Sequence, residues 1–297
     1  MSKQPFIKMH GLGNDFVVLD ARKDAIDLEP LEVKSIADRH LGIGCDQVIV
    51  LKNTPKADVF MQIFNADGSE VSACGNASRC IAARVMKEKK RDHITLETKA
   101  GVLDAYDGGE GLITVDMGPV KTDWQDIPLS EERDTLHLGF QVAQPGDAGK
   151  VLMGDPVAVN VGNPHVVFIV GMPEVVDLAK VGPLIETAPL FPERVNVSVI
   201  QIVGDDLIKA KVWERGAGLT DACGTAACAA LVAAHRRGMM GRSGVVILPG
   251  GPLGVLWRED NHILLTGPAS TAYEGSFDIR ALLMGQLERM RSVGEGA

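Results

Sequence analysis

The sequence has few aromatic residues, no excess of positive charge and no long apolar run. Phe, Trp and Tyr make up 4% of its 297 residues, and the formal net charge is −9. A nucleic-acid-binding protein usually presents clustered basic residues, so that class is not expected. No apolar run approaches the roughly 18 residues of a membrane-spanning helix, and residues 1–10 lack the apolar core of a signal peptide. We therefore expect a cytoplasmic protein with no nucleic-acid or membrane partner.

The sequence also lacks the patterns of a disulfide framework, a zinc site or a nucleotide loop. The cysteines are odd in number and include no Cys-x-x-Cys pair; they are Cys45, Cys74, Cys80, Cys223 and Cys228. Such a set is expected to stay reduced and to bind no metal. Residues 10–15 (HGLGND) lack the G-x-G-x-x-G spacing, and no G-K-[ST] phosphate loop occurs. Neither a metal nor another cofactor is predicted.

The chain does contain an internal repeat. Residues 73–77 (ACGNA) and 222–226 (ACGTA) place two cysteines 149 positions apart (223 − 74). Other segments match at the same offset: Gly13-Asn14 with Gly162-Asn163, Gln47-Val48 with Asn196-Val197, Phe64-Asn65 with Trp213-Glu214, and Gly118-Pro119 with Gly267-Pro268. Chance does not keep one register through several separated segments, so we predict a duplicated fold.

Apolar, β-branched runs predict seven strands in each half, in the same order. They lie at 5–9, 15–20, 47–51, 58–64, 94–98, 102–106 and 112–117, and at 157–161, 165–170, 195–203, 207–214, 245–248, 253–257 and 262–266. Each half also has a short amphipathic helix (31–40, 175–186) and a helix that begins just after a cysteine (75–90, 224–237). The small apolar residues of the last helix suggest burial on most sides. We expect an α/β (α+β) fold in which each half is a curved mixed sheet, or barrel, around a central helix.

These patterns set the predicted domains. The N-terminal half is residues 1–119 plus 269–297 and carries Cys74; the C-terminal half is residues 120–268 and carries Cys223. The segment 120–150 is polar and contains Pro and Gly, so it is predicted to be a connector. Residues 277–293 have helical spacing and are expected to fold back on the first half.

The two repeated cysteines are candidates for acid–base chemistry. Each precedes a glycine and a helix, so each is expected at a helix N-terminus, where unpaired N–H groups and the helix dipole lower a thiol pKa. The same N–H groups could bind a carboxylate. The alternative is that both are small core residues, as most free cysteines are. That explanation suffices for Cys45, Cys80 and Cys228, but it does not explain two cysteines at equivalent positions.

Polar residues also recur at equivalent positions: Asn14 with Asn163, Gln47 with Asn196, and Asn65 with Glu214. Individually such residues are often turn-formers or caps. Together with the cysteines they predict a cleft between the halves, in which the unmatched Arg215 and His165 could bind the asymmetric part of a ligand.

One thiol on each side of a carbon atom suits stereoinversion, in which one thiol removes a proton and the other returns one. A thiol metal site would need further ligands, which are not found at sensible spacing.

Several motifs resemble those of the diaminopimelate epimerase family. They are residues 9–16 (MHGLGNDF), 64–70 (FNADGSE), 162–165 (GNPH), 213–216 (WERG) and 222–225 (ACGT), in a match that extends from Phe6 to about Gly275. Three positions depart from the commonest pattern, Cys45, the 73–79 segment and Ala226, but none removes a functional side chain. The resemblance implies a cofactor-independent enzyme that interconverts LL- and meso-2,6-diaminopimelate for lysine and peptidoglycan synthesis. It also implies two similar α/β domains and is compatible with a homodimer.

The resemblance further implies roles for individual residues. Cys74 and Cys223 resemble the catalytic pair, and His165 and Glu214 the groups that tune the thiols. The substrate-binding positions are Asn14, Gln47, Asn65, Gly75, Asn76, Asn163, Asn196, Glu214, Arg215, Gly224 and Thr225, of which Gly75-Asn76 and Gly224-Thr225 are the helix N-termini that hold the α-carboxylate. Arg215 is suited to the distal carboxylate, since a guanidinium binds a carboxylate as a fork.

Two other functions could also use a pair of cysteines at equivalent positions. A proline racemase-like enzyme shares this kind of fold, but there the first cysteine is typically followed by Gly-His, whereas Cys74 precedes Gly75-Asn76. A thiol redox or ligand-binding protein could use a reversible disulfide between Cys74 and Cys223. That hypothesis leaves the matched polar pairs and Arg215 unexplained.

Overall fold

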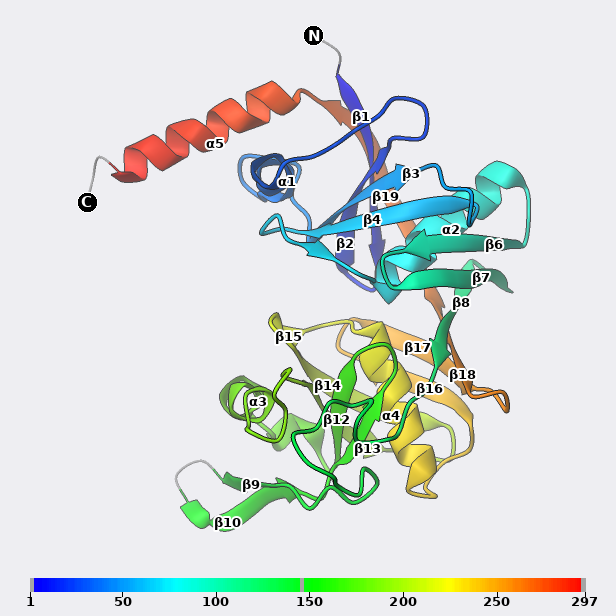
Figure 1. Cartoon of the computed structure of the whole chain (residues 1–297), viewed down its shortest axis with the longest axis vertical. Helices are drawn as coiled ribbons and strands as arrows, with labels where there is room; N and C mark the ends of the chain where they lie inside the picture. The colour runs from blue at the N-terminus through cyan, green and yellow to red at the C-terminus, as the bar shows by residue number, and fades with distance from the viewer. Residues whose placement is uncertain (1–2, 145–146, 295–297) are drawn as a thin grey trace. The chain divides into compact units, whose positions relative to one another are not determined.

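The computed structural model describes residues 3–144 and 147–294, which form two compact units. Unit 1 is Met1–Ile113 with Pro268–Ala297, and unit 2 is Thr114–Gly267. Figure 1 labels their helices and strands. The divisions at 113/114 and 267/268 lie beside the sequence-based boundaries at 119/120 and 268/269.

Unit 1 is a mixed sheet around one helix. Its strands pair in the order β19-β1-β2-β3-β4-β6-β7, with β2–β3 and β4–β6 parallel and the other pairs antiparallel. Their bounds are β1 Gln4–Gly11, β2 Asn14–Asp20, β3 Gln47–Lys52, β4 Val59–Asn65, β6 His93–Thr98, β7 Gly101–Gly109 and β19 Ser270–Phe277; the short β5 Glu70–Val71 also pairs with β4, and β8 Leu112–Pro119 leads into unit 2. Helix α2 (Gly75–Lys89) contacts β1, the second strand of this order, and β6 and β7 at the other end, so the sheet curves around it.

Unit 2 repeats this arrangement. Its strands pair in the order β11-β12-β13-β14-β16-β17-β18, with β12–β13 and β14–β16 parallel. The bounds are β11 Val157–Asn160, β12 Pro164–Ile169, β13 Asn196–Ile202, β14 Leu207–Glu214, β15 Gly218–Thr220, β16 Ser243–Leu248, β17 Gly251–Trp257 and β18 His262–Pro268. Helix α4 (Gly224–Arg236) contacts strands from β11 to β17, and every residue from Ala226 to Ala234 is buried. Small side chains let the strands approach it closely on all sides, as expected for a central helix.

The strand registers confirm the duplication residue by residue. In unit 1, Phe16 lies opposite Gln47, and Val48 opposite Phe64. In unit 2, His165 lies opposite Asn196, and Val197 opposite Trp213. All of these partners differ by the same 149 positions (165 − 16, 196 − 47). Because a one-residue slip would turn every side chain to the other face, the repeated register places equivalent side chains on equivalent faces.

The segment 120–150 is not the simple connector that was predicted. It contains strand β9 (Gln141–Gln144), which pairs with β10 (Asp147–Gly154) in a small separate sheet. Its isolated apolar residues Ile127, Leu129 and Leu138 are buried in the core of unit 2. Single apolar residues among polar ones have no periodicity, so the pattern could not show that this segment is packed.

The remaining helices agree with expectation in type but differ in extent. The 175–186 segment is a 3₁₀ turn (Pro173–Val175) followed by α3 (Leu178–Glu186). The C-terminal helix α5 (Ile279–Gly294) packs on α1 (Pro30–Ala37) in unit 1, as predicted. Leu282 of α5 joins the apolar cluster there, and Gln286 Nε2 donates to Asp38 Oδ2 at 2.8 Å.

Candidate functional site

Cys74 and Cys223 each form the N-cap of the central helix of their unit. Both have extended dihedral angles, with φ −151° at Cys74 and −125° at Cys223. The Cys74 carbonyl accepts a hydrogen bond from Ser78 N–H at 2.9 Å, and the Cys223 carbonyl accepts one from Ala227 N–H at 3.1 Å. The predicted placement is therefore confirmed: each thiol stands where the first N–H groups of a helix have no intrahelical partner.

In unit 1 the side chain of Asn14 joins the thiol to the helix N-terminus. Its Oδ1 accepts hydrogen bonds from Cys74 Sγ at 3.8 Å and from Asn76 Nδ2 at 3.2 Å. The Arg79 guanidinium in turn donates to Asn76 Oδ1 at 2.7 Å, and Arg79 is completely buried. These contacts fix the orientation of both amides, so Asn14 and Asn76 occupy defined positions beside Cys74.

A charged network that the sequence analysis did not identify holds the other end of Asn14. Asn14 Nδ2 donates to Asp46 Oδ2 at 2.8 Å, and Arg39 bridges Asp46 and Asp15 at 2.7 and 2.8 Å. Lys8 also pairs with Asp15, at 2.6 Å. Burial raises the pKa of Asp15, but the hydrogen bonds from Arg39 and Lys8 outweigh it and lower that pKa to about 2. Asp15 is thus ionised at neutral pH, as its pairing with two cations requires.

Gln47 and Asn65 form a second polar pair in unit 1. Gln47 Nε2 donates to Asn65 Oδ1 at 3.0 Å, where the first residue of β3 lies opposite the last residue of β4. Gln47 Oε1 is buried and has no hydrogen-bond partner among residues 3–144 and 147–294. A buried polar atom without a partner is uncommon in folded proteins. Gln47 Oε1 is therefore an acceptor that a ligand ammonium or hydroxyl could satisfy.

The environment of Cys223 contradicts the expectation of a low thiol pKa. Burial raises the pKa of this thiol well above its usual value, and the charge of Glu214 raises it further. Thr225 Oγ1 lies 3.5 Å from the sulfur, but its hydrogen bond to the sulfur does not offset those two effects. Burial also raises the pKa of the Glu214 carboxyl, which is hydrogen-bonded to Cys223 and to Thr220. Cys223 is therefore a protonated thiol at neutral pH, despite its place at a helix N-terminus.

His165 is a neutral, buried imidazole. Its Nε2 lies 2.8 Å from Asn163 Oδ1, and Nδ1 has no partner among the residues that the structure describes. Burial lowers the pKa of His165 to about 3, with a further contribution from the positive charge of Arg215. The neutral ring thus donates from Nε2 to Asn163 and leaves Nδ1 as an acceptor. Its predicted influence on the thiols stays a prediction.

Asn196 and Arg215 are linked through the backbone. Asn196 Nδ2 donates to the Pro164 carbonyl at 2.8 Å, and Asn196 Oδ1 accepts the Arg215 N–H at 2.9 Å. The guanidinium of Arg215 is exposed and donates to the Glu193 carbonyl at 3.0 Å. Asn196 thus ties the start of β12 to the backbone of Arg215.

A low His165 pKa predicts a specific dependence of stability on pH. The unfolded chain binds a proton at His165 below about pH 6.5, whereas the folded chain does not until about pH 3. The free energy of unfolding should therefore decrease as the pH falls from about 6.5 to 4.5. This pH range lies above the one in which carboxylates with lowered pKa values titrate in the folded protein. We expect His165→Phe, which introduces the residue found at the equivalent Phe16, to flatten this slope in urea unfolding measured at pH 4.5, 5.5 and 6.5. An unchanged slope would show that His165 is protonated in the folded protein.

The three other cysteines are core residues. Cys45, Cys80 and Cys228 are buried, and burial raises the pKa of Cys45 and of Cys80 to about 12. Within the described part of the chain, no group of three or more His, Cys, Asp or Glu side chains could hold a metal ion. Among those same residues, no helix is both long and apolar enough to cross a membrane.

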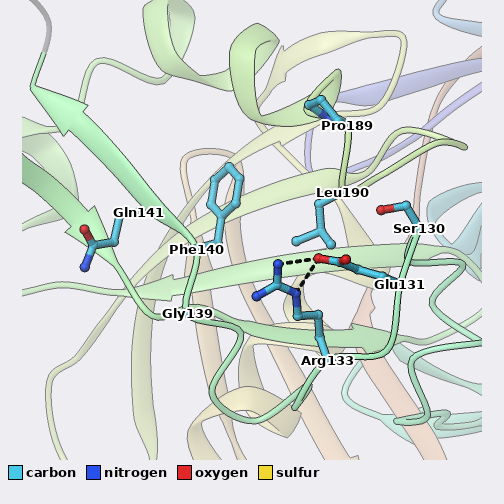
Figure 2. Close-up of a pocket in the computed structure, with 8 residues that line it drawn as sticks. All are labelled: Ser130, Glu131, Arg133, Gly139, Phe140, Gln141, Pro189 and Leu190. Atoms are coloured by element: carbon cyan, nitrogen blue, oxygen red, sulfur yellow. Dashed lines mark hydrogen bonds and ion pairs between the residues drawn. The ribbon is translucent and has the colours of Figure 1, made fainter.

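A pocket of about 470 Å³ lies elsewhere in unit 2 (Figure 2). Its lining is made by Ser130, Glu131, Arg133, Gly139, Phe140, Gln141, Pro189 and Leu190. Arg133 faces Glu131 in an ion pair, so its charge is already balanced (Figure 2). The lining contains none of the predicted site residues.

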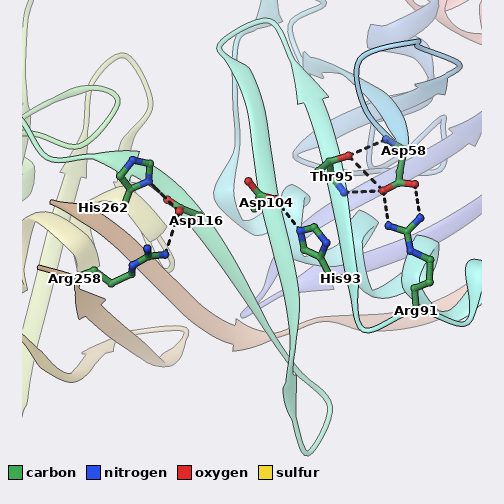
Figure 3. A network of polar contacts seen from close by, with 8 residues as sticks. All are labelled: Asp58, Arg91, His93, Thr95, Asp104, Asp116, Arg258 and His262. Atoms are coloured by element: carbon green, nitrogen blue, oxygen red, sulfur yellow. Dashed lines mark hydrogen bonds and ion pairs between the residues drawn. The ribbon is translucent and has the colours of Figure 1, made fainter. Parts of the chain in front are cut away.

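Polar clusters on the outer strands have structural roles (Figure 3). In unit 1, Asp58 accepts hydrogen bonds from Arg91 and from the Thr95 N–H, which ties β6 to the residue before β4. Burial raises the pKa of Asp58, but the hydrogen bonds from Lys89 and Thr95 outweigh it and lower that pKa to about 2. In unit 2, Asp116 lies 2.9 Å from His262 Nδ1, which joins β8 to β18 (Figure 3). These charges satisfy one another at strand ends.

Comparison with known proteins identifies relatives of the whole chain. The family model described as diaminopimelate epimerase matches residues 6–122 and 157–272. A diaminopimelate epimerase of Rhodospirillum centenum is 49% identical over 284 residues, which cover 95% of this chain and 94% of the relative. One of Erythrobacter litoralis is 50% identical over 274 residues, which cover 92% and 97%.

Solved structures of lower sequence identity share the fold. A probable proline racemase of Agrobacterium radiobacter superposes with a TM-score of 0.65 at 17% identity, over 93% of both chains. A phenazine biosynthesis protein of the PhzF family from Bacillus anthracis has a TM-score of 0.64 at 16% identity, over 94% of this chain and 100% of its own. These likenesses concern the fold alone, whereas the family model and the relatives near 50% identity cover the predicted site residues as well. The chain belongs to the diaminopimelate epimerase family.

Proposed function

We propose that this protein interconverts LL- and meso-2,6-diaminopimelate by a two-base mechanism without a cofactor. Membership of the family makes it an isomerase of the epimerase type. The observation that carries the mechanism is the placement of Cys74 and Cys223 as N-caps of the two equivalent central helices. Each thiol has a polar side chain beside it, Asn14 at Cys74 and Glu214 and Thr225 at Cys223, which supports two acid–base groups at equivalent places in the duplication.

Each half-reaction moves one proton. The thiolate of one cysteine takes the α-proton, and the electron pair of the broken C–H bond passes into the α-carboxylate. The thiol of the other cysteine then gives its proton to the opposite face of the carbon. After one turnover the first sulfur carries the proton and the second is a thiolate, which is the state ready for the reverse reaction.

Helix N-termini stabilise the developing charge in this mechanism. The N–H groups at Gly75-Asn76 and Gly224-Thr225 would hold the α-carboxylate, on which negative charge accumulates as the proton leaves. The raised pKa of Cys223 suits it to begin as the acid, because burial and the charge of Glu214 favour its protonated form. The base in that cycle is Cys74, and the unit 1 counterpart of Glu214 is the uncharged Asn65.

The other predicted residues would bind the rest of the substrate. Asn14, Asn65, Asn163 and Asn196 supply amides whose orientations are fixed by neighbouring side chains or by the backbone. Gln47 Oε1 and His165 Nδ1 are the buried acceptors available for ammonium or N–H groups. Arg215 is the cation for the distal carboxylate.

Arg215→Lys tests that assignment. Lysine keeps the charge but presents a point charge in place of a planar fork, so a bidentate carboxylate contact is lost. We expect kcat/KM for diaminopimelate to fall by about 10–100-fold, mainly through KM, the scale of a charged hydrogen bond left unmade. Steady-state kinetics check this, with Arg133→Lys, an exposed arginine of the same unit that pairs with Glu131, as the control. Unchanged KM and kcat would remove Arg215 from the distal subsite.

The direct test of the function is an assay with reduced protein. Purified protein is incubated with LL-diaminopimelate and a thiol reductant, without pyridoxal phosphate, and the meso isomer is measured by chiral chromatography. Steady formation of the meso isomer supports the proposal and excludes a role limited to a reversible disulfide. Turnover of L-proline in place of diaminopimelate would instead identify a proline racemase.

The resemblance extends the proposal to the cellular setting. We propose a cytoplasmic homodimer whose product serves lysine and peptidoglycan synthesis. Light scattering of the purified protein at several concentrations measures the assembly directly. A molar mass equal to that of one 31.7 kDa chain at every concentration would contradict the dimer.

A further inference from the structure

We propose that Glu186 is a positioning residue that holds the Trp213–Gly218 turn in place, and through it sets Arg215 for the distal carboxylate of the substrate. This inference rests on the proposed function and adds a residue that the sequence patterns did not reveal. Glu186 is the last residue of α3, which lies against β14 and β15 (Figure 1). It is one of the few acidic side chains in the described chain that are buried, with 6% of its surface exposed.

Both carboxylate oxygens of Glu186 are used, and both bind the turn that carries Arg215. Oε1 accepts the Gly216 N–H at 3.0 Å, and Oε2 accepts the Trp213 Nε1–H at 2.7 Å. The two donors lie on either side of the Glu214-Arg215 pair in the sequence. A buried carboxylate is costly unless its oxygens are hydrogen-bonded and its charge is paired. Here the turn supplies both hydrogen-bond donors, and Arg194 Nη1 lies 3.6 Å from Oε1. The contact therefore constrains the backbone before and after Arg215.

The indole of Trp213 is itself fixed by glycines. A Cβ at Gly182 of α3 would lie 2.6 Å from Cγ of the indole, so no side chain larger than hydrogen fits there. The other edge of the ring faces Gly218, which has a φ of +90° that favours glycine. Because the ring cannot shift toward α3, its N–H is held on the Glu186 carboxylate.

Two further contacts complete the constraint on Arg215. Its N–H donates to Asn196 Oδ1 at 2.9 Å, and its guanidinium donates to the Glu193 carbonyl at 3.0 Å. The charged head nevertheless stays exposed. An exposed cation on a fixed backbone loses less conformational entropy when it binds an anion than a mobile one does. Glu186 should therefore act on substrate affinity rather than on proton transfer.

The duplication supports this assignment independently. At the offset of 149, Arg215 corresponds to Ala66, and Glu186 corresponds to Ala37 (186 − 149). The unit 1 turn has no arginine to position, and its Ala66 N–H donates to a backbone carbonyl, that of Asp46, at 3.1 Å. The buried glutamate and the arginine thus occur together in one unit and are absent together from the equivalent positions of the other.

The test is Glu186→Gln, with Asp177→Asn at the opposite end of α3 as the matched control. A glutamine has one acceptor oxygen, so its NH₂ group would face either the indole N–H or the Gly216 N–H, and one hydrogen bond would be lost. We expect KM for diaminopimelate to rise about tenfold while kcat changes less than about twofold, the scale of one charge-assisted hydrogen bond. Amide hydrogen exchange in a peptide covering 211–220 should become faster. Asp177→Asn should change none of these.

A double-mutant cycle decides whether Glu186 acts through Arg215. In an Arg215→Lys background, Glu186→Gln should raise KM by less than about twofold, because the interaction that it supports is already lost. An equal tenfold loss in both backgrounds, or a loss confined to kcat, would overturn the proposal. If Glu186→Gln does not fold, Trp213→Phe, which keeps an aromatic ring of smaller size and removes the N–H donor, takes its place. A wild-type protein that does not epimerise diaminopimelate would overturn the proposed function instead, while the exchange measurement would still report whether Glu186 holds the turn.

Discussion

Cys74→Ser and Cys223→Ser are each expected to reduce epimerisation by about 10⁴-fold, the upper range for loss of a positioned proton-transfer group. Serine is nearly the same size as cysteine, but its hydroxyl is far too weak an acid to form the anion needed near neutral pH. The effect should appear in kcat, because both helix N-termini, which are proposed to bind the α-carboxylate, remain in place. Chiral chromatography of each reaction, started from either isomer, measures it.

Each single variant retains one thiol and should keep part of the chemistry. In deuterated solvent the remaining thiolate can still exchange the α-proton of the isomer that presents its proton to that side, without inverting the carbon. Cys74→Ser and Cys223→Ser should therefore exchange opposite isomers, which proton NMR detects as loss of the α-proton signal. In the wild-type protein the newly formed epimer should carry solvent deuterium at once, while the remaining starting isomer stays mostly protiated early in the reaction.

Cys80→Ser and Cys228→Ser are the matched controls for this experiment. Both cysteines lie in the same two helices as the proposed catalytic pair, and both are completely buried in the core. Their replacement should affect stability more than kcat, because neither stands at a helix N-terminus. If Cys74→Ser or Cys223→Ser kept near-normal epimerisation, the two-base assignment would be wrong, and the functional reading of the duplication would be wrong with it.

The fold could be predicted from the sequence because the chain contains two copies of the same order of strands and helices. The offset of 149 that aligned Cys74 with Cys223 also aligns the β2–β3 and β12–β13 registers in the structure. Hydrophobic periodicity located the repeated strands to within three residues, and a cysteine followed by glycine located both helix starts. It missed β19, which lies outside the repeat, and the short strands β5 and β15. Features that repeat along the chain can be detected by comparing the chain with itself, without knowledge of its contacts.

Contacts between distant segments were not predictable in this way. Asp46 holds Asn14 across 32 positions, and Glu186 holds Trp213 across 27, yet neither acidic residue belongs to a repeated pattern. The packing of 120–150 was missed because its buried residues occur singly. The pKa of Cys223 was predicted in the wrong direction because the helix N-terminus is visible in the sequence, whereas the burial of the thiol and the nearby Glu214 carboxylate become visible only in the fold.

The environment of Cys223 leads to the second large effect, that of Glu214→Gln. Glu214 is hydrogen-bonded to the Cys223 thiol, and its negative charge adds to burial in raising the thiol pKa. Glutamine has nearly the same size and can still accept from Thr220, but it has no charge. The pKa of Cys223 should therefore fall, so that more of the thiol is ionised at any given pH.

Two measurements follow from that loss of charge. Alkylation of Cys223 by iodoacetamide, followed by mass spectrometry of the labelled peptide, should begin at lower pH in Glu214→Gln than in the wild type, because only the thiolate reacts. Epimerisation should fall by up to about a hundredfold in kcat, since burial alone would then favour the protonated form of the residue proposed to return the proton. Glu193→Gln is the control, because Glu193 is exposed and contacts Arg215 only through its backbone carbonyl.

Loss of activity together with an unchanged alkylation profile would mean that Glu214 binds substrate and does not control the proton on Cys223. Earlier alkylation with full activity would mean that the protonated state of Cys223 does not limit the reaction, and the assignment of Cys223 as the starting acid would then be wrong.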